Sequence, residues 1–365
     1  MDSSEFLKRA ALWLVLRLKR FIQAFFPRRQ PDVFLDCANE WRYPSYLVRA
    51  LRSIGDILIE IPQSSTSFML RNSSLRDFVQ RLIIVADDET PNAKIIISRN
   101  ADSWSKCARS RVHVSVDYFA PNREVKALVM PYFIHPRLWR FEREFARPWN
   151  RNRPIRIGFA GTINDKAYTE VFRFPIMSRS EMFRTLNARF HDCIQFVQSR
   201  AEYARAKFTR LPIIIVAVER EGDSLKKHIL NGREYLRFLA NCAFFIAPPG
   251  FAMPFAHNLI EAMFLGAIPI LNYASYLSPP LRNGIDCLTF STPDELSQII
   301  DRALTMAPDE IERLRVGVRH YVDDYLSPVA FGRRLYAEVE TSPTIIVNAE
   351  KESLTLWSEQ HLVAG

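Results

Sequence analysis

Residues 239–272 read LANCAFFIAPPGFAMPFAHNLIEAMFLGAIPILN. A short apolar run, residues 243–247, ends in two prolines and Gly250, as a buried strand does where it enters a loop. A helical pattern follows, Gly266 suits the C-terminal end of that helix, and residues 267–272 begin another apolar run. This order of strand, loop, helix and strand predicts an α/β domain with parallel strands.

The same alternation extends along the chain from residue 32. The apolar runs are continuous, which is typical of parallel strands buried on both faces. We therefore predict two Rossmann-like, doubly wound α/β domains that face a cleft. The predicted strands are residues 33–37, 56–61, 81–86, 94–98, 112–116, 127–130, 155–160, 211–218, 243–247, 267–272 and 287–290, and the predicted helices include residues 178–190, 232–241, 258–265 and 294–304. The predicted domains span residues 31–145 and 146–340, with a helix at 1–30 and a tail at 341–365.

Glycine is concentrated in the second half of the chain. Only Gly55 lies between residues 32 and 150, whereas seven glycines lie between residues 158 and 284. Nucleotide phosphates are bound where the backbone approaches closely at a helix N-terminus, and glycine permits that approach. The second domain is therefore the predicted nucleotide-binding domain.

Residues 1–30 have a charge pattern of their own. They contribute +5 of the chain's net charge of +9, and residues 5–26 place apolar side chains on one helical face, opposite lysine and arginine. No uncharged run there exceeds seven residues, whereas a spanning helix needs about 20. We predict a basic amphipathic helix that binds an anionic membrane surface through residues 5–29; a helix packed on the rest of the protein is the alternative. No nucleic-acid motif accompanies the charge, so no nucleic-acid partner is predicted.

The five cysteines are widely spaced and include no Cys-x-x-Cys pair, which argues against a disulfide framework and a zinc site. Their pattern fits a reducing compartment, and no signal-peptide pattern is present, so we expect a cytoplasmic, peripherally membrane-associated protein. The chain also has no Gly-x-Gly-x-x-Gly fingerprint and no P-loop, which argues against dehydrogenases and P-loop nucleotidases.

The segment at residues 239–272 resembles the donor-binding segment of GT-B glycosyltransferases, in which a loop glycine, a helical Glu-Ala pair and a Gly-x-Ile-Pro turn recur. Its Pro-Pro-Gly loop is most similar to the exostosin-like group. IRIGFAGTIN at 155–164 is similar to the opening strand and glycine loop of a GT-B C-terminal domain, and VMPYFIHP at 129–136 to the strand that precedes the hinge. The resemblance covers residues 32–340. It implies sugar transfer from a nucleotide-sugar donor, a substrate and not a cofactor, to a glycan or lipid-linked acceptor.

Physical arguments support donor-binding roles for particular residues. A helix N-terminus at His257 and Asn258 offers N–H groups and a positive dipole end to a diphosphate. Glu261, one turn further, is predicted to accept hydrogen bonds from two ribose hydroxyls. Gly161 and Thr162 follow the predicted strand at residues 155–160, and Arg220 follows the predicted strand at residues 211–218. Both positions lie at the carboxyl edge of the predicted sheet, where glycine and arginine suit the binding of a phosphate. The predicted donor-binding residues are Gly161, Thr162, Arg220, Gly250, His257, Asn258 and Glu261.

The stereochemistry is predicted from a missing carboxylate. Retaining GT-B enzymes often have two glutamates separated by seven residues, and the positions that would hold the partner of Glu261 are Met253 or Pro249. The resemblance therefore implies an inverting transfer, which needs a general base for the acceptor hydroxyl. Asp36 and Glu40 follow the first strand of the N-terminal domain and are the predicted catalytic bases, Glu40 being the better placed to face the cleft.

A second pattern favours a different fold. LIIVADDE at residues 82–89 places Asp87 and Glu89 after an apolar strand, similar to the metal-binding Asp-x-Asp of GT-A enzymes. Because the segment at 239–272 has no counterpart in GT-A, we interpret these acids as a strand-end loop and predict no metal. Two further classes stay open: a nucleotide-sugar epimerase of the same two-domain shape, and a non-catalytic nucleotide- or glycan-binding module.

Overall fold

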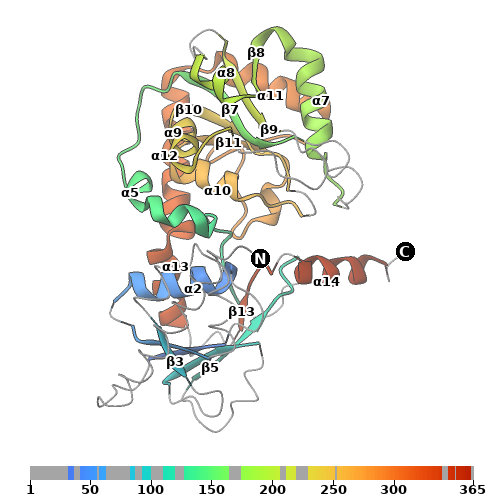
Figure 1. Cartoon of the computed structure of the whole chain (residues 1–365). Coiled ribbons are helices and arrows are strands. Elements are labelled where there is room, and N and C mark those ends of the chain that lie inside the picture. Colours follow the sequence, from blue (N-terminus) through green and yellow to red (C-terminus); the bar gives the residue numbers. More distant parts are fainter. Residues whose placement is uncertain are drawn as a thin grey trace, which may run out of the picture. The chain divides into compact units, whose positions relative to one another are not determined.

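The protein contains two compact units, Met1–Met130 with Ser327–Gly365, and Pro131–Leu326. The computed structural model (Figure 1) describes residues 32–36, 42–55, 57–62, 83–86, 93–99, 110–119, 127–163, 174–205, 211–218, 229–250, 253–338, 344–349 and 351–362. The helix predicted at residues 1–30 lies outside these ranges. None of the helices that the structure describes has the length and apolar character needed to cross a membrane.

The first unit is built on a parallel seven-stranded sheet with the strand order β3-β2-β1-β4-β5-β13-β6. Its strands are β1 (Val33–Leu35), β2 (Ile59–Pro62), β3 (Ile83–Ala86), β4 (Ile95–Ser98), β5 (Ser110–Ser115), β6 (Leu128–Val129) and β13 (Thr344–Ile346), and its helices are α2 (Arg42–Ser53), α13 (Pro328–Glu338) and α14 (Lys351–Leu362). The sequence predicts the first six strands, and all six are confirmed with shifted ends.

The C-terminal segment changes the predicted domain boundaries. β13 pairs with both β5 and β6, so residues assigned to a tail at 341–365 supply an inner strand of the first sheet. Helix α13, assigned by the sequence to the second domain, packs on α2, where Gly332 lies against the backbone carbonyl of Ala50. The rings of Tyr46 and Phe331 meet there at 5.7 Å. The predicted boundaries at 145/146 and 340/341 are therefore replaced by 130/131 and 326/327.

The second unit is built on a parallel six-stranded sheet with the strand order β12-β11-β10-β7-β9-β8. The strands are β7 (Ile155–Thr162), β8 (Ile194–Val197), β9 (Ile213–Val218), β10 (Cys242–Ile246), β11 (Ile268–Leu271) and β12 (Leu288–Thr289). The helices are η3 (Pro136–Phe141), α5 (Glu142–Phe145), α7 (Arg179–Phe190), η4 (His191–Cys193), α8 (Arg200–Arg205), α9 (Gly232–Ala240), α10 (His257–Phe264), η5 (Ala274–Tyr276), α11 (Pro293–Thr305), α12 (Pro308–Tyr321) and η6 (Val322–Leu326). Two parallel sheets with flanking helices confirm the predicted doubly wound α/β class.

The order of these strands creates a switch point beside β7. The chain runs from β7 to β8 and back to β9 on one side, and then crosses to β10 on the other side. Helices α7 and α11 pack together, whereas α9, α10 and α12 form a second group around α10 (Figure 1). In open α/β sheets the carboxyl ends of strands at such a point form a crevice in which ligands bind.

The C-terminal end of helix α10 is defined by a glycine and by two side chains from residues 149–153. At the C-terminal end, Gly266 adopts φ +79°, a left-handed conformation that glycine takes without strain. The last carbonyl groups are also satisfied, because Trp149 Nε1 donates to Phe264 O at 2.9 Å and Arg153 Nη2 donates to Leu265 O at 2.5 Å. The prediction that Gly266 ends this helix is confirmed: Leu265 is the C-cap residue and Gly266 follows it.

Candidate functional site

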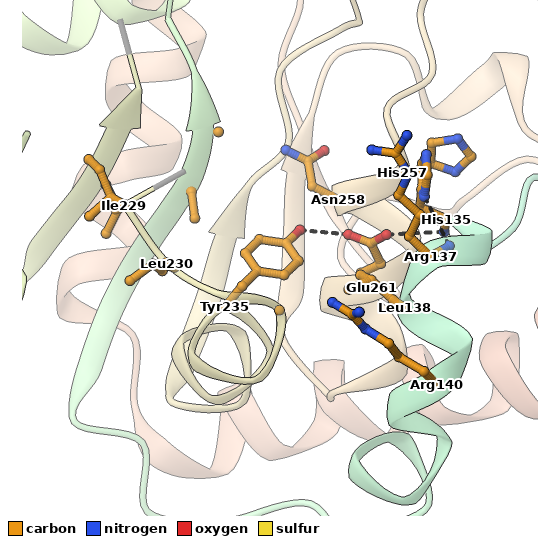
Figure 2. Close-up of a pocket in the computed structure, with 14 residues that line it drawn as sticks. His135, Arg137, Leu138, Arg140, Ile229, Leu230, Tyr235, His257, Asn258 and Glu261 are labelled. Atoms are coloured by element: carbon orange, nitrogen blue, oxygen red, sulfur yellow. Dashed lines mark hydrogen bonds between the residues drawn. The ribbon is translucent and has the colours of Figure 1, made fainter. Parts of the chain in front are cut away.

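A pocket of about 530 Å³ lies at the carboxyl ends of β7 and β9, within the second unit (Figure 2). Its walls come from those strand ends, the segment that leads into α9, the first turns of α9 and α10, and helix η3 with the residue before it. The fourteen lining residues are His135, Arg137, Leu138, Arg140, Ala160, Gly161, Val216, Ile229, Leu230, Gly232, Tyr235, His257, Asn258 and Glu261. The pocket therefore occupies the switch point that the strand order predicts.

Helix α10 presents its N-terminus to this pocket. The two prolines after β10 end the strand, and the helix begins at His257 after Ala256, which occupies the N-cap position. An alanine side chain accepts no hydrogen bond, so the N-cap residue leaves the first-turn N–H groups without a side-chain cap. Because His257 and Asn258 both line the pocket, the positive end of the helix dipole is available to an anion there.

Glu261 is buried in the pocket wall, with only 3% of the residue exposed. Its Oε2 accepts a hydrogen bond of 2.6 Å from the Tyr235 hydroxyl, and its Oε1 accepts one of 3.1 Å from the backbone N–H of His135 (Figure 2). Burial raises the pKa of Glu261 to about 7, while these two hydrogen bonds act in the opposite direction. Each carboxylate oxygen has two lone pairs, so Glu261 keeps acceptor capacity for a ligand hydroxyl.

Asn258 contributes a second acceptor, one turn before Glu261. Its Oδ1 is buried and receives no hydrogen bond within the part of the chain that the structure describes. An acceptor left in this state costs about 1–3 kcal/mol, which a ligand donor would recover. Residues three apart on a helix share a face, so Asn258 and Glu261 offer neighbouring acceptors to a hydroxylated ligand.

The imidazole of His257 is held in one orientation. Its Nδ1 lies 2.7 Å from the backbone oxygen of Phe133, and because a carbonyl only accepts, Nδ1 carries the hydrogen. The ring stacks on Tyr132 with centroids 4.7 Å apart and planes inclined by 19°. The ring of His135 meets it edge-on at 4.9 Å. Two imidazoles therefore stand beside the uncapped end of α10.

Arg137 and Arg140 add positive charge from helix η3. Both are exposed, both line the pocket, and neither forms an ion pair with an acidic residue among those described. The guanidinium of Arg140 lies 4.7 Å from the ring centroid of Phe141. Away from these cations the lining includes Ile229 and Leu230, so one part of the pocket suits an anionic group and another an apolar or aromatic one.

Four of the seven predicted donor-binding residues come together in this pocket: Gly161, His257, Asn258 and Glu261. Two others lie elsewhere. The Thr162 carbonyl accepts a hydrogen bond from Arg179 Nη1 at 2.9 Å, and Thr162 is not part of the lining. Gly250 is also outside the lining: a Cβ there would collide with the backbone oxygens of Met253 and Phe255, so this glycine is explained by packing of its own loop.

The remaining predicted residues belong to other parts of the chain. Arg220, Glu40 and the acidic pair Asp87 and Glu89 all lie outside the described residues. Asp36 follows β1 in the first unit, where its Oδ2 accepts a hydrogen bond of 3.0 Å from the Ser98 hydroxyl. The donor-binding role of Arg220 and the catalytic roles of Asp36 and Glu40 stay predictions.

Ten of the fourteen lining residues were not predicted from the sequence, and four of these ten have polar or charged side chains: His135, Arg137, Arg140 and Tyr235. His135 lies in the segment 129–136, which the resemblance assigned to a strand before the hinge and not to a binding site, and Arg137 and Arg140 follow that segment directly. The repeated arginines after this segment were the available signal. Tyr235 has no comparable signal, because only the packing of α9 on α10 brings its hydroxyl to Glu261.

No family model matches the sequence, and no curated protein is significantly similar to it. Among solved structures, the Anabaena protein Alr3699/HepE in complex with UDP aligns with 85% of this chain and 99% of its own, at 9% identity and a TM-score of 0.47. A glycosyltransferase from Rickettsia africae aligns with 86% of this chain and 100% of its own, at 13% identity and a TM-score of 0.47. WaaG, a glycosyltransferase involved in lipopolysaccharide biosynthesis, aligns with 85% of this chain and 99% of its own, at 10% identity and a TM-score of 0.37.

Proposed function

We propose that this chain is a glycosyltransferase of the GT-B type that transfers a sugar from a nucleotide-sugar donor to a glycan or lipid-linked acceptor. One observation carries the proposal: a single pocket combines the N-terminus of α10, which its N-cap residue leaves uncapped, two arginines with no ion pair among the described residues, and two hydroxyl acceptors, Asn258 and Glu261. Its volume of about 530 Å³ falls in the usual range for small-molecule sites, roughly 300–1,000 Å³.

Each part of a nucleoside diphosphate has a complementary group in this pocket. The diphosphate is assigned to the N-terminus of α10 with Arg137 and Arg140, since helix dipoles and guanidinium groups both favour phosphate. The ribose hydroxyls are assigned to Glu261, which is one helical turn away and is held by Tyr235 and His135. The base is assigned to the apolar wall that includes Ile229 and Leu230.

The proposed transfer is inverting and needs no metal. A base takes the proton of the acceptor hydroxyl, the hydroxyl oxygen attacks the anomeric carbon, and the bond to the diphosphate breaks. The nucleoside diphosphate leaves with that electron pair, and Arg137, Arg140 and the α10 dipole stabilise its charge. Asp36 and Glu40 remain the proposed bases. Loss of turnover with EDTA that manganese restores would contradict the metal-independent mechanism.

The basic helix predicted at residues 1–30 motivates a proposed location. Its charge and apolar face suit the cytoplasmic surface of an anionic membrane, where a lipid-linked acceptor would also be found. We therefore propose that the enzyme is a peripheral membrane protein.

The proposal is tested first by nucleotide binding. Full-length protein is titrated with nucleoside diphosphates, and the tightest ligand is compared in wild type, Arg137→Ala/Arg140→Ala and Arg143→Ala. Arg143 is an exposed arginine of the neighbouring helix α5 that does not line the pocket, so it controls for loss of charge. The double variant should bind at least about tenfold more weakly, because each arginine offers a charge-assisted hydrogen bond, and the control should match wild type.

Turnover then separates the three classes that the sequence leaves open. Incubation of the protein with the matching nucleotide-sugar and no acceptor should release free sugar and nucleoside diphosphate slowly, because a transferase can use water in place of its acceptor. Conversion into a second nucleotide-sugar would instead indicate an epimerase. Tight nucleotide binding with no product of either kind, also when glycan or lipid acceptors are added, would indicate a binding module and reject the proposed activity.

A further inference from the structure

A second cavity, of about 310 Å³, lies in the second unit between residues 148–151 and helix α12. Three arginines line it, Arg151, Arg315 and Arg319, together with Trp149 and Glu312. It shares no lining residue with the first pocket. Three guanidinium groups and one carboxylate give these walls a net charge of +2, which favours an anionic ligand.

One wall of this cavity is rigid because Trp149 is fixed. The indole Nε1 donates to the backbone oxygen of Phe264 at 2.9 Å, and the ring lies directly over Gly266, where a Cβ would collide with it. The guanidinium of Arg319 then stacks on this indole, 4.0 Å from the ring centroid. Such stacking orients an arginine while leaving its N–H groups available to a ligand.

The opposite wall is helix α12, which is fixed through Gly317. A Cβ at this position would collide with the backbone oxygen of Ile285, so the helix packs directly on that turn. From this helix Arg315 enters the cavity wall with 5% of the residue exposed. The walls are therefore formed before any ligand binds, which reduces the entropy that binding would cost.

Arg315 is only partly neutralised by its surroundings. Its Nη1 donates to Glu312 Oε2 at 2.7 Å, but its Nε is buried and finds no acceptor within the described chain. The buried Arg153 stands close enough for the charge of Arg315 to lower its pKa, after the larger effect of burial; together they bring the pKa of Arg153 to about 10. A bound anion would offset this repulsion and supply the missing acceptor.

We propose that the cavity at Trp149, Arg151, Arg315 and Arg319 is a second ligand site, which binds a phosphate group carried by a soluble or membrane-bound ligand. A tetrahedral dianion matches the net charge of +2, and its several oxygens match the paired N–H groups of arginine better than a single carboxylate does. The proposal does not rest on the proposed function, because none of these residues belongs to the donor pocket.

The test uses the full chain in the Arg137→Ala/Arg140→Ala background, so that phosphate binding at the first pocket is weakened. Inorganic phosphate is titrated by calorimetry, and vesicles of phosphatidylcholine with phosphatidic acid are used for co-sedimentation. Arg151→Ala/Arg319→Ala should weaken binding of at least one probe by about tenfold or more, as expected for two charge-assisted contacts. Arg313→Ala should leave binding unchanged, because Arg313 is exposed on α12 and outside the cavity lining.

The two probes identify the source of the phosphate. If Arg151→Ala/Arg319→Ala weakens only the binding of vesicles, the phosphate belongs to a lipid headgroup. If it weakens the binding of inorganic phosphate, the ligand is soluble. Arg319→Lys serves as a second variant: it keeps the charge but removes the stacked fork, so it should bind more weakly than wild type with an unchanged melting temperature. Failure of both probes to bind, or equal binding by Arg151→Ala/Arg319→Ala and Arg313→Ala, would overturn the proposal.

Discussion

Glu261 has an unusual acid–base character because it is buried between α9, α10 and the start of η3. Its pKa is raised from 4.5 to about 7, mainly by burial. The folded protein therefore holds a proton on Glu261 between these pH values, where the unfolded chain does not. The stability gained in this way is complete below about pH 4.5 and is lost as the pH rises through about 7.

Replacement of Glu261 by glutamine should make stability less dependent on pH. The amide fills the same space but does not ionise, so the variant should lose less stability than wild type between pH 5 and pH 8. Urea unfolding at both pH values measures this difference. Equal losses in the two proteins would mean that Glu261 ionises normally, and its assignment as a desolvated ligand-binding carboxylate would then be wrong.

Sequence patterns locate individual residues unevenly. Glu261 and Asn258 are predictable because their spacing places them on the first turns of a helix that follows a strand and a loop. For Gly250 the sequence predicts close approach to a ligand, and the structure adds that the backbone oxygens of Met253 and Phe255 fill the space where a side chain would be. A glycine in a sequence does not reveal whether a ligand or the protein itself makes the close approach.

At the scale of elements, α10 determines where the first pocket lies. Its N-terminus faces the pocket, and its C-terminus is anchored by Trp149, Arg153 and Gly266. Anchoring at one end fixes the direction in which the other end points. Substitutions at the C-terminal end of α10 should therefore lower the stability of the protein. They should also weaken ligand binding, because they shift the position of the helix.

Replacement of Gly266 by alanine should destabilise the protein more than replacement of Gly284. Both glycines have positive φ, +79° and +74°, so each alanine should cost about 1 kcal/mol or more in strain. Only at Gly266 would the new Cβ also collide, with Trp149 and Arg153, whereas the space around Gly284 is open. Overpacking of this kind adds about 1–3 kcal/mol. Chemical denaturation of both variants measures the difference; equal losses would contradict the anchoring role.

Some elements were predictable and others were not. Helices α7, α9, α10 and α11 appear within one or two residues of their predicted ends, because strong N-caps, prolines or glycines mark several of those ends. Strand β8 was not predicted, since this four-residue edge strand has two partly or fully exposed positions and no continuous apolar run. Because β8 pairs with the outer side of β9, β9 is an inner strand between β7 and β8, and its Val216 lines the pocket.

At the scale of the whole molecule, residues 1–30 are predicted to determine membrane association. Deletion of these residues should leave a folded protein whose binding to phosphatidylserine vesicles is weaker, because the deletion removes a net charge of +5 and one apolar helical face. Binding of the full-length protein should also fall as salt rises. Co-sedimentation of both proteins at low and high salt measures this, and equal binding by the two would reject the prediction.

The C-terminal segment shows why a domain boundary is hard to predict from local patterns. The three residues of β13 are too few to stand out as a strand, and nothing in their sequence indicates a partner more than two hundred residues away. Yet Ile345 pairs with Val114 on one side and with Leu128 on the other, inside a parallel sheet. Helix α14 continues this attachment, because the Ser353 hydroxyl donates to Val116 O at 2.7 Å.

Deletion of residues 341–365 should therefore unfold part of the first unit and spare the second. Without β13, the facing backbone groups of β5 and β6 lose their hydrogen-bond partners, and buried groups in that state are costly. Hydrogen exchange followed by mass spectrometry should show faster exchange in peptides that cover β5 and β6, while peptides that cover β7 and β10 stay protected. A chain shortened only by residues 363–365 keeps β13 and α14 and is the matched control. Unchanged protection of β5 and β6 after the longer deletion would mean that the segment is a dispensable tail, as its sequence alone suggested.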